Sequence, residues 1–138
     1  MELFKNHLIL KYFLIVLLFL TSCKNDPCNK IEYKNGMSFK DGSPYSGTCI
    51  NLHSNGEIKS IQNYKKGYDH GKWEFFYRDK KTQTKGTFNM GKKNGEWTYY
   101  YENGMLHKEQ FYDNGKKIGV WKTYDENGEI SSVTNALN

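Results

Sequence analysis

Proline is scarce in this sequence, whereas aromatic residues are common. Only two of the 138 residues are proline, and 16% are phenylalanine, tryptophan or tyrosine. Disordered segments are usually poor in aromatic residues, because they cannot bury enough apolar surface to offset the entropy lost on folding. The composition therefore excludes a chain that is disordered throughout, and the length allows one folded domain besides an N-terminal segment.

The sequence also lacks the residue patterns of catalytic and metal-binding sites. There is no His-x-x-x-His and no paired cysteine–histidine spacing, so zinc coordination is not indicated. No serine stands in a Gly-x-Ser-x-Gly context. The acidic residues fall mostly at expected turns and strand edges, whereas a glycosidase pair needs two of them to converge in a cleft, which a flat repeat sheet rarely forms. We therefore expect no enzyme activity, no metal ion and no cofactor.

The formal net charge is +5, and much of the positive charge falls in short lysine pairs. The pairs are Lys65-Lys66, Lys92-Lys93 and Lys116-Lys117. We interpret them as solvated loop charges, with a membrane surface or an acidic partner as the alternative. We expect no nucleic acid partner, given where the N-terminus directs the chain.

Residues 1–22 have the features of a targeting segment. Lys5 and Lys11 accompany an apolar run from Tyr12 to Leu20, which is too short for a comfortable transmembrane helix. Leu20-Thr21-Ser22-Cys23 follows at once. This arrangement resembles a bacterial lipoprotein signal peptide, which implies that Cys23 is lipidated and becomes the new N-terminus. An ordinary secretory signal or an uncleaved anchor is the alternative.

Lipidation of Cys23 predicts attachment to the bacterial cell envelope, and we expect the outer membrane. Residues 23–30 would then be the lipidated cysteine and a tether. Cys28 and Cys49 remain as an even pair in an oxidising compartment, where a disulfide between them would connect the tether to the folded domain. The alternative is two free thiols, with Cys49 a small buried residue.

Four columns of residues recur with a period of 24 through the rest of the chain. The two glycine columns are Gly47, Gly71, Gly95, Gly119 and Gly67, Gly91, Gly115. The other two columns are Cys49, Trp73, Trp97, Trp121 and Tyr64, Phe88, Tyr112. Four columns in one register indicate an internal repeat.

The repeat domain is expected at 31–138, as a cap and four copies. The cap is 31–46, and the copies are 47–70, 71–94, 95–118 and 119–138. The first copy is the weaker one, because Cys49, Asn51 and His53 stand where later copies have aromatic residues. The last copy fades after Val133, as expected of a terminal repeat.

Each copy has the pattern of a β-hairpin, which is clearest at 95–118. An aromatic-rich strand leads to Asn103-Gly104, a strong signal for a two-residue turn in which both residues take positive φ. Such a turn would place Trp97 opposite Gln110. The second copy has Asp79-Lys80-Lys81 at this point, and we expect a longer or different turn there.

The same turn predicts which side chains share a face, because side chains alternate across a strand. One face would carry Trp97, Tyr99, Tyr101, Leu106 and Tyr112, together with Lys108 and Gln110. The other would carry Thr98, Tyr100, His107, Glu109 and Phe111. We expect the first face to be buried, and residues 113–117 to form a polar loop to the next copy.

These columns resemble the MORN-repeat variant family over about residues 31–133. The pattern is Gly-x-Trp-x-x-Tyr/Phe-x-x-Asn-Gly, followed by a polar strand, an aromatic residue and Gly-Lys-Lys-x-Gly. The resemblance implies an all-β fold: an elongated, single-layer antiparallel sheet of successive hairpins that mediates protein contacts or membrane attachment. Bacterial members are often labelled YwqK-type antitoxins of toxin–antitoxin systems. Cys49 in the tryptophan column and the altered turn near Asp79 depart from the pattern.

The aromatic columns are the remaining candidate site. Trp73, Trp97, Tyr99, Tyr101 and Trp121 would form the core of a thin sheet, a partly exposed strip that binds a partner, or both. We expect a monomeric, non-enzymatic interaction or scaffold module that binds a protein through a sheet face or a strand edge. An antitoxin for an exported toxin is a special case, and binding of a glycan or surface polymer is the alternative.

Overall fold

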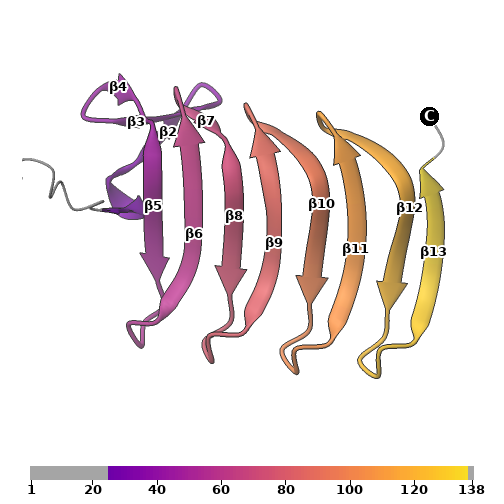
Figure 1. Cartoon of the computed structure of the whole chain (residues 1–138). Helices are drawn as coiled ribbons and strands as arrows, with labels where there is room; N and C mark the ends of the chain where they lie inside the picture. The colour runs from indigo at the N-terminus through magenta and orange to yellow at the C-terminus, as the bar shows by residue number, and fades with distance from the viewer. Residues whose placement is uncertain (1–24, 137–138) are drawn as a thin grey trace, which may run out of the picture.

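The computed structural model describes residues 25–136, which are almost entirely β-structure. The long strands lie side by side in chain order, each antiparallel to the one before it (Figure 1). They are β5 (Gly47–Leu52), β6 (Ile58–Lys65), β8 (Gly71–Phe76), β9 (Thr82–Asn89), β10 (Lys92–Tyr100), β11 (Leu106–Asp113), β12 (Lys116–Tyr124) and β13 (Ile130–Ala136). The predicted all-β, single-layer sheet of successive hairpins is therefore confirmed.

Short elements complete both the sheet and the N-terminal end. The edge strand β1 (Asp26–Pro27) runs parallel to β5, and β7 (Tyr68–Asp69) pairs with β6. A separate three-stranded sheet contains β2 (Glu32–Lys34), β3 (Met37–Lys40) and β4 (Ser43–Pro44). The 3₁₀ helix η1 (Cys28–Lys30) connects β1 to this small sheet.

The turn inside the hairpin of each of the four copies has three residues rather than two. In the third copy, the Tyr101 N–H donates to the Met105 carbonyl at 2.9 Å, and the Gly104 N–H donates to the Tyr101 carbonyl at 2.9 Å. Gly104 has φ of 90°, whereas Asn103 is not in the positive-φ region. This is a type I turn followed by a left-handed residue, so the predicted two-residue turn is wrong.

The predicted register is nevertheless correct away from the turn, where Trp97 lies opposite Gln110. Nearer the turn, a bulge places Tyr100, and not Tyr101, opposite Leu106. The assignment of Leu106 to the same face as Trp97 is therefore wrong. The reason is geometric: the extra loop residue shifts the pairing by one, and the bulge shifts it back.

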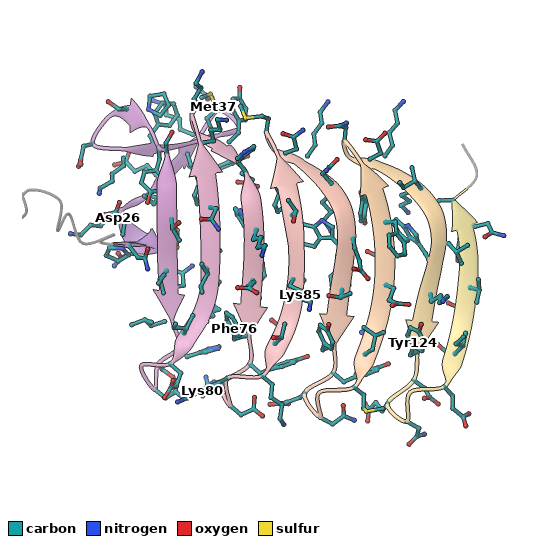
Figure 2. The ribbon with its side chains drawn as sticks, in the orientation of Figure 1. Asp26, Met37, Phe76, Lys80, Lys85 and Tyr124 are labelled. Atoms are coloured by element: carbon teal, nitrogen blue, oxygen red, sulfur yellow. A yellow bond between two sulfur atoms is a disulfide. The ribbon has the colours of Figure 1, made fainter. Side chains whose placement is uncertain are left out.

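The second copy makes the same turn without glycine. The Tyr77 N–H donates to the Lys81 carbonyl at 2.8 Å, and the Lys80 N–H donates to the Tyr77 carbonyl at 3.1 Å. Lys80 adopts the left-handed conformation, with φ of 70°, at the end of the sheet opposite to Met37 (Figure 2). The expectation of a longer or different turn at Asp79 is therefore wrong.

The connections between copies are two-residue turns at the other end of the strands. Their central pairs, all with positive φ, are Lys66-Gly67, Met90-Gly91 and Asn114-Gly115. Asp113 pairs directly with Lys116 across the last of these turns. The polar connection predicted at 113–117 is therefore present but shorter than predicted, since 114–115 form the turn and strand pairing continues through the other residues.

The small sheet is bonded to the turn between the first two copies. The Ser38 N–H donates to the Gly67 carbonyl at 2.8 Å, and the Gly67 N–H donates to the Tyr45 carbonyl at 2.8 Å. Few hydrophobic residues are buried in the described part of the chain: Tyr45 is 6% exposed, Cys49 0% and Trp97 3%. Within residues 25–136, no helix has the length and apolar character needed to cross a membrane.

Candidate interaction surfaces

Aromatic rings from successive copies form a row across one face of the sheet, which we call the aromatic row. Its members are Tyr45, Tyr64, Trp73, Phe88, Trp97, Tyr112 and Trp121. Adjacent ring centroids lie 5.6, 5.4, 5.0 and 4.9 Å apart from Tyr45 to Trp97, and Tyr112 lies 5.1 Å from Trp121. Tilted and edge-to-face contacts of this kind stabilise a fold by about 0.5–1.5 kcal/mol each beyond burial. The aromatic row is therefore the core of the thin sheet.

Lys93 interrupts the aromatic row between Trp97 and Tyr112. Its Nζ atom lies 4.2 Å from the Trp97 ring centroid and 5.1 Å from that of Tyr112. It also donates to the Tyr99 hydroxyl at 2.8 Å. An ammonium over ring faces is attracted by their negative electrostatic potential. The expectation that the lysine pairs are solvated loop charges is therefore wrong for Lys93, which is half-buried.

The tryptophan indoles also bond to the preceding strand, at the same point in each copy. Trp73 Nε1 donates to the Asn63 carbonyl at 2.8 Å, Trp97 Nε1 to the Thr87 carbonyl at 3.1 Å, and Trp121 Nε1 to the Phe111 carbonyl at 3.1 Å. The pairing of β9 with β10 shifts register in this region. The repeated tryptophan therefore joins neighbouring copies through a polar bond as well as through its ring.

The five aromatic residues predicted to contact a partner differ in exposure. Trp97 is only 3% exposed and belongs to the core. Trp73, Tyr99, Tyr101 and Trp121 are half-buried. The structure brings the three tryptophans into the aromatic row with Tyr99 beside it, while Tyr101 lies at the turn end and donates to the backbone of the next copy.

Histidines take structural positions and do not converge. His53 Nε2 lies 2.9 Å from the Phe76 carbonyl, in the position from which the Tyr77 hydroxyl bonds the following copy. His107 stacks on Tyr101 with ring centroids 4.3 Å apart, on the opposite side from that predicted, and burial lowers its pKa. Among residues 25–136, no three histidine, cysteine or acidic side chains are grouped as a metal site.

A pocket of about 440 Å³ lies beside the first part of the aromatic row, and we call it the Asp69 pocket. Its walls include Tyr33 from β2, Tyr64 and Asp69 from β6 and β7, and Trp73 from β8. Burial raises the pKa of the Asp69 carboxyl. Burial, and secondarily the charge of Asp69, raises the pKa of Tyr64 to about 12. None of the ion pairs within residues 25–136 includes Asp69.

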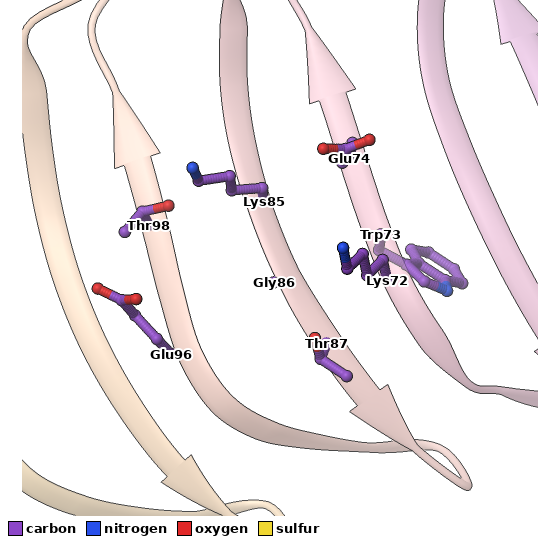
Figure 3. A pocket seen from close by; sticks show the side chains of 8 residues that line it. All are labelled: Lys72, Trp73, Glu74, Lys85, Gly86, Thr87, Glu96 and Thr98. Carbon is purple, nitrogen blue, oxygen red and sulfur yellow. The ribbon is translucent and has the colours of Figure 1, made fainter.

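A second hollow, of about 300 Å³, lies between β8, β9 and β10 (Figure 3). Lysine and glutamate alternate along it, with Lys72 and Glu74 on β8, Lys85 on β9 and Glu96 on β10. Thr98 is 6% exposed, and its Oγ1 has no hydrogen-bond partner in the described part of the chain. The hollow is polar and shallow, and it is of a size that admits water or a small polar molecule.

The comparison with protein families places the repeats in a known class. The model of the MORN repeat variant matches residues 45–66, 69–90, 93–116 and 117–138, which together are more than half of the chain. The chain belongs to the MORN repeat variant family. Each MORN match begins two residues before the corresponding predicted copy, and the period is the same. No curated protein is significantly similar to the chain.

The two edges of the MORN sheet differ. At the C-terminal edge, β13 pairs with β12 alone in the described residues, and Ile130 and Val133 are 57% and 55% exposed. Residues 130–136 contain no lysine, arginine, acidic residue or proline. At the N-terminal edge, β5 is covered by β1, which ends in Pro27. Charged residues and proline are the usual means of protecting an edge, and β13 has neither.

Of the predicted cysteine sites, the structure describes two. Cys28 and Cys49 are joined by a disulfide with their Cα atoms 4.9 Å apart, which connects η1 to the first MORN hairpin. Cys23, the predicted lipidation site, lies outside the described residues. The disulfide and β1 together close the N-terminal edge.

Sequence reasoning missed three residues that shape these surfaces: Gly86, Asp69 and Lys93. Gly86 and Asp69 differ from the residues at the same position of the other MORN copies, whereas Lys93 recurs as Lys117. A comparison of the copies position by position would have shown this. Gly86 stands where the neighbouring copies have Gln62 and Gln110, and Asp69 stands where the later copies have lysine. The signal was therefore present as a departure from the repeat, but its meaning depends on contacts between copies.

Proposed function

We propose that this MORN protein is a lipid-anchored envelope protein whose repeats form a non-enzymatic protein-binding module, with β13 as its docking strand. The observation that carries the proposal is the open edge of β13, which is exposed, uncharged and free of proline. An extended segment of a partner gains main-chain hydrogen bonds by adding to such an edge. The exposed side chains of Ile130 and Val133 on β13 would then make apolar contacts with the added segment.

The anchor and the docking strand of the proposed module would lie at opposite ends of the sheet. The lipid on Cys23 would hold the N-terminal end at the membrane, through the short tether of residues 23–30. The disulfide and β1 protect the edge on that side. The strands then lead away in chain order to β13 at the far end of the sheet (Figure 1). Binding at β13 would therefore place the partner at a distance from the anchor.

Affinity capture from envelope extracts tests the docking strand, with residues 24–138 as bait. We expect one enriched protein that is lost with Val133→Lys, because an edge lysine opposes strand addition. Leu52→Lys is the matched control: Leu52 is 59% exposed but lies on β5, and this variant should retain the partner. Equal capture by both variants, or no enriched protein, would contradict a docking role for β13.

The membrane anchor is tested separately, by fractionation of the Cys23→Ser variant. Loss of the mature protein from the membrane fraction is expected, because the acyl chains on this cysteine supply the attachment. Retention at mature size would contradict lipidation. An antitoxin role would require that the captured partner be an exported toxin. Enrichment of a glycan or surface polymer in place of a protein would favour the alternative function.

A further inference from the structure

Asp69 reverses a charge that the later repeats conserve. It stands 24 residues before Lys93 and 48 before Lys117, in the same column. Both lysines place their ammonium group over the tryptophan that follows them in the sequence, at 4.2 Å from the Trp97 centroid and 4.5 Å from the Trp121 centroid. Asp69 precedes Trp73 by the same spacing, but it supplies a carboxylate in place of the ammonium.

A carboxylate next to ring faces is unfavourable in isolation. The faces of Tyr64 and Trp73 carry negative electrostatic potential, and burial also disfavours the charged form of Asp69. No lysine or arginine in residues 25–136 forms an ion pair with it. A cation in the pocket would be attracted both by the carboxylate and by the rings, so the two kinds of wall favour the same ligand.

The pocket also has room for such a ligand. Its volume of about 440 Å³ lies between the aromatic row and the small N-terminal sheet, and Tyr33 at its rim is 75% exposed. Where Lys93 is present, the row opens and the ammonium lies between Trp97 and Tyr112. At the second copy, Trp73 instead contacts Phe88 directly, with centroids 5.0 Å apart, and the cavity lies on the side of Tyr64 and Asp69.

We propose that the Asp69 pocket binds the ε-ammonium group of a lysine side chain from a protein partner, with Asp69 as its counter-ion and Trp73 and Tyr64 as its aromatic walls. The ligand class follows from the other copies, in which lysines from the same sequence column as Asp69 place their ammonium groups against a tryptophan ring. The source of the lysine rests on the proposed protein-binding function. The binding of an ammonium group by the pocket does not depend on that function, and it can be measured with a free lysine derivative.

The test is a titration followed by ¹H–¹⁵N correlation spectra of the indole groups of residues 24–138. The chain has three tryptophans, so Trp97 and Trp121 are internal references for Trp73. With Nα-acetyl-lysine N-methylamide up to about 50 mM, a range that covers millimolar affinities, the Trp73 resonance should shift and saturate. The Nε-acetylated derivative, which has no charge, should produce no saturable shift.

Two variants decide the role of the carboxylate, and the spectra show directly whether each is folded. Asp69→Asn should weaken binding at least about tenfold, which corresponds to about 1.4 kcal/mol. Asp113→Asn removes the same charge at an exposed site and should bind as the wild type does. An unchanged Trp73 resonance, or equal affinity of Asp69→Asn and the wild type, would overturn the proposal. Because no partner is present, this result is independent of capture through β13.

Discussion

Gly86 determines how deeply the central tryptophan is buried. A side chain at this position would place its Cβ atom 2.2 Å from Cδ2 of Trp97, so only glycine allows the indole to lie against β9. Trp97 is 3% exposed, whereas Trp73 and Trp121 are half-buried, and the copies that precede theirs have Gln62 and Gln110 at the position of Gly86. The absence of a side chain at Gly86 thus allows Trp97 to be more deeply buried than the other two tryptophans of the aromatic row.

The substitution Gly86→Ala should destabilise the protein by about 1–3 kcal/mol, because the indole must move out of its place over the backbone. Chemical denaturation followed by tryptophan fluorescence measures the change. Gln110→Ala, at the same column of the next copy, is the control and should cost about 1 kcal/mol or less. If the two variants were equally stable, the indole would not depend on Gly86.

The tyrosines of the first copies make stability sensitive to alkaline pH. Burial, followed by interactions with Asp26 and Tyr64, raises the pKa of Tyr45 to about 12, and the pKa of Tyr64 is raised to a similar value. The ordinary pKa of tyrosine is about 10. The folded state therefore holds these phenolic protons more tightly than the unfolded state. The contribution of the two tyrosines to the free energy of unfolding is complete below pH 10 and is lost as the pH rises through 12.

We expect the free energy of unfolding to fall between pH 10 and pH 11.5, and to fall less steeply in Tyr64→Phe, which has no phenolic proton to lose. Urea denaturation at a series of pH values measures both slopes. Tyr33→Phe is the matched control, because it removes the hydroxyl of a tyrosine that is 75% exposed. Parallel slopes for the wild type and Tyr64→Phe would show that Tyr64 does not carry this dependence.

At the scale of the elements, two kinds of turn alternate along the chain. The three-residue turns within hairpins need one residue at positive φ, and glycine fills that position in three copies. The second copy has Lys80 there, with φ of 70°. Side-chain to backbone bonds maintain the turn, since Asp79 Oδ1 accepts the Lys81 N–H at 3.2 Å and Lys81 Nζ donates to the Glu102 carbonyl at 3.0 Å.

Lys80→Gly should therefore stabilise the protein by about 0.5–1 kcal/mol, because glycine adopts the left-handed conformation without the steric cost of a Cβ atom. The exposed ion pair of Lys80 with Glu57 is lost, but such pairs contribute little. Thermal or urea denaturation measures the gain. Lys80→Ala removes the same charge and keeps the Cβ atom, so it should not stabilise; a similar gain in both variants would assign the effect to charge.

At the scale of the whole molecule, the sheet is an array in which each copy contacts mainly its neighbours. Stability in such arrays is a sum of repeat and interface contributions, and terminal units open first. The N-terminal end has a disulfide and a small additional sheet, whereas β13 is exposed along most of its length. The centre contains Trp97 in the aromatic row.

Native-state hydrogen exchange should therefore be fastest in β13 and slowest in β9 and β10. Reduction of the disulfide between Cys28 and Cys49 should accelerate exchange in β1 and β5 while leaving β12 and β13 unchanged, because these strands share no contact with the bond. Uniform exchange rates across all strands, before and after reduction, would indicate that the sheet opens as one unit.

The sequence alone determined the repeat, the number of copies, the all-β class and the register of Trp97 with Gln110. These features are local: they depend on strand-forming residues, turn residues and a period, and each is repeated four times. The turn types were predicted wrongly because Asn-Gly and Gly-Lys-Lys are each compatible with more than one loop length. The pairing of the flanking strands decides which loop length each of these sequences adopts.

Tertiary structure alone decided which surfaces are available. Trp97 is buried because Gly86 lies beneath it on another strand, and Lys93 is withdrawn from solvent because two rings flank it. Asp69 acquires aromatic walls only when Tyr33 of β2, Tyr64 of β6 and Trp73 of β8 line one pocket with it. The edge of β13 differs from that of β5 only because β1 returns to cover the latter. These outcomes require contacts between segments far apart in the chain, which no local pattern encodes.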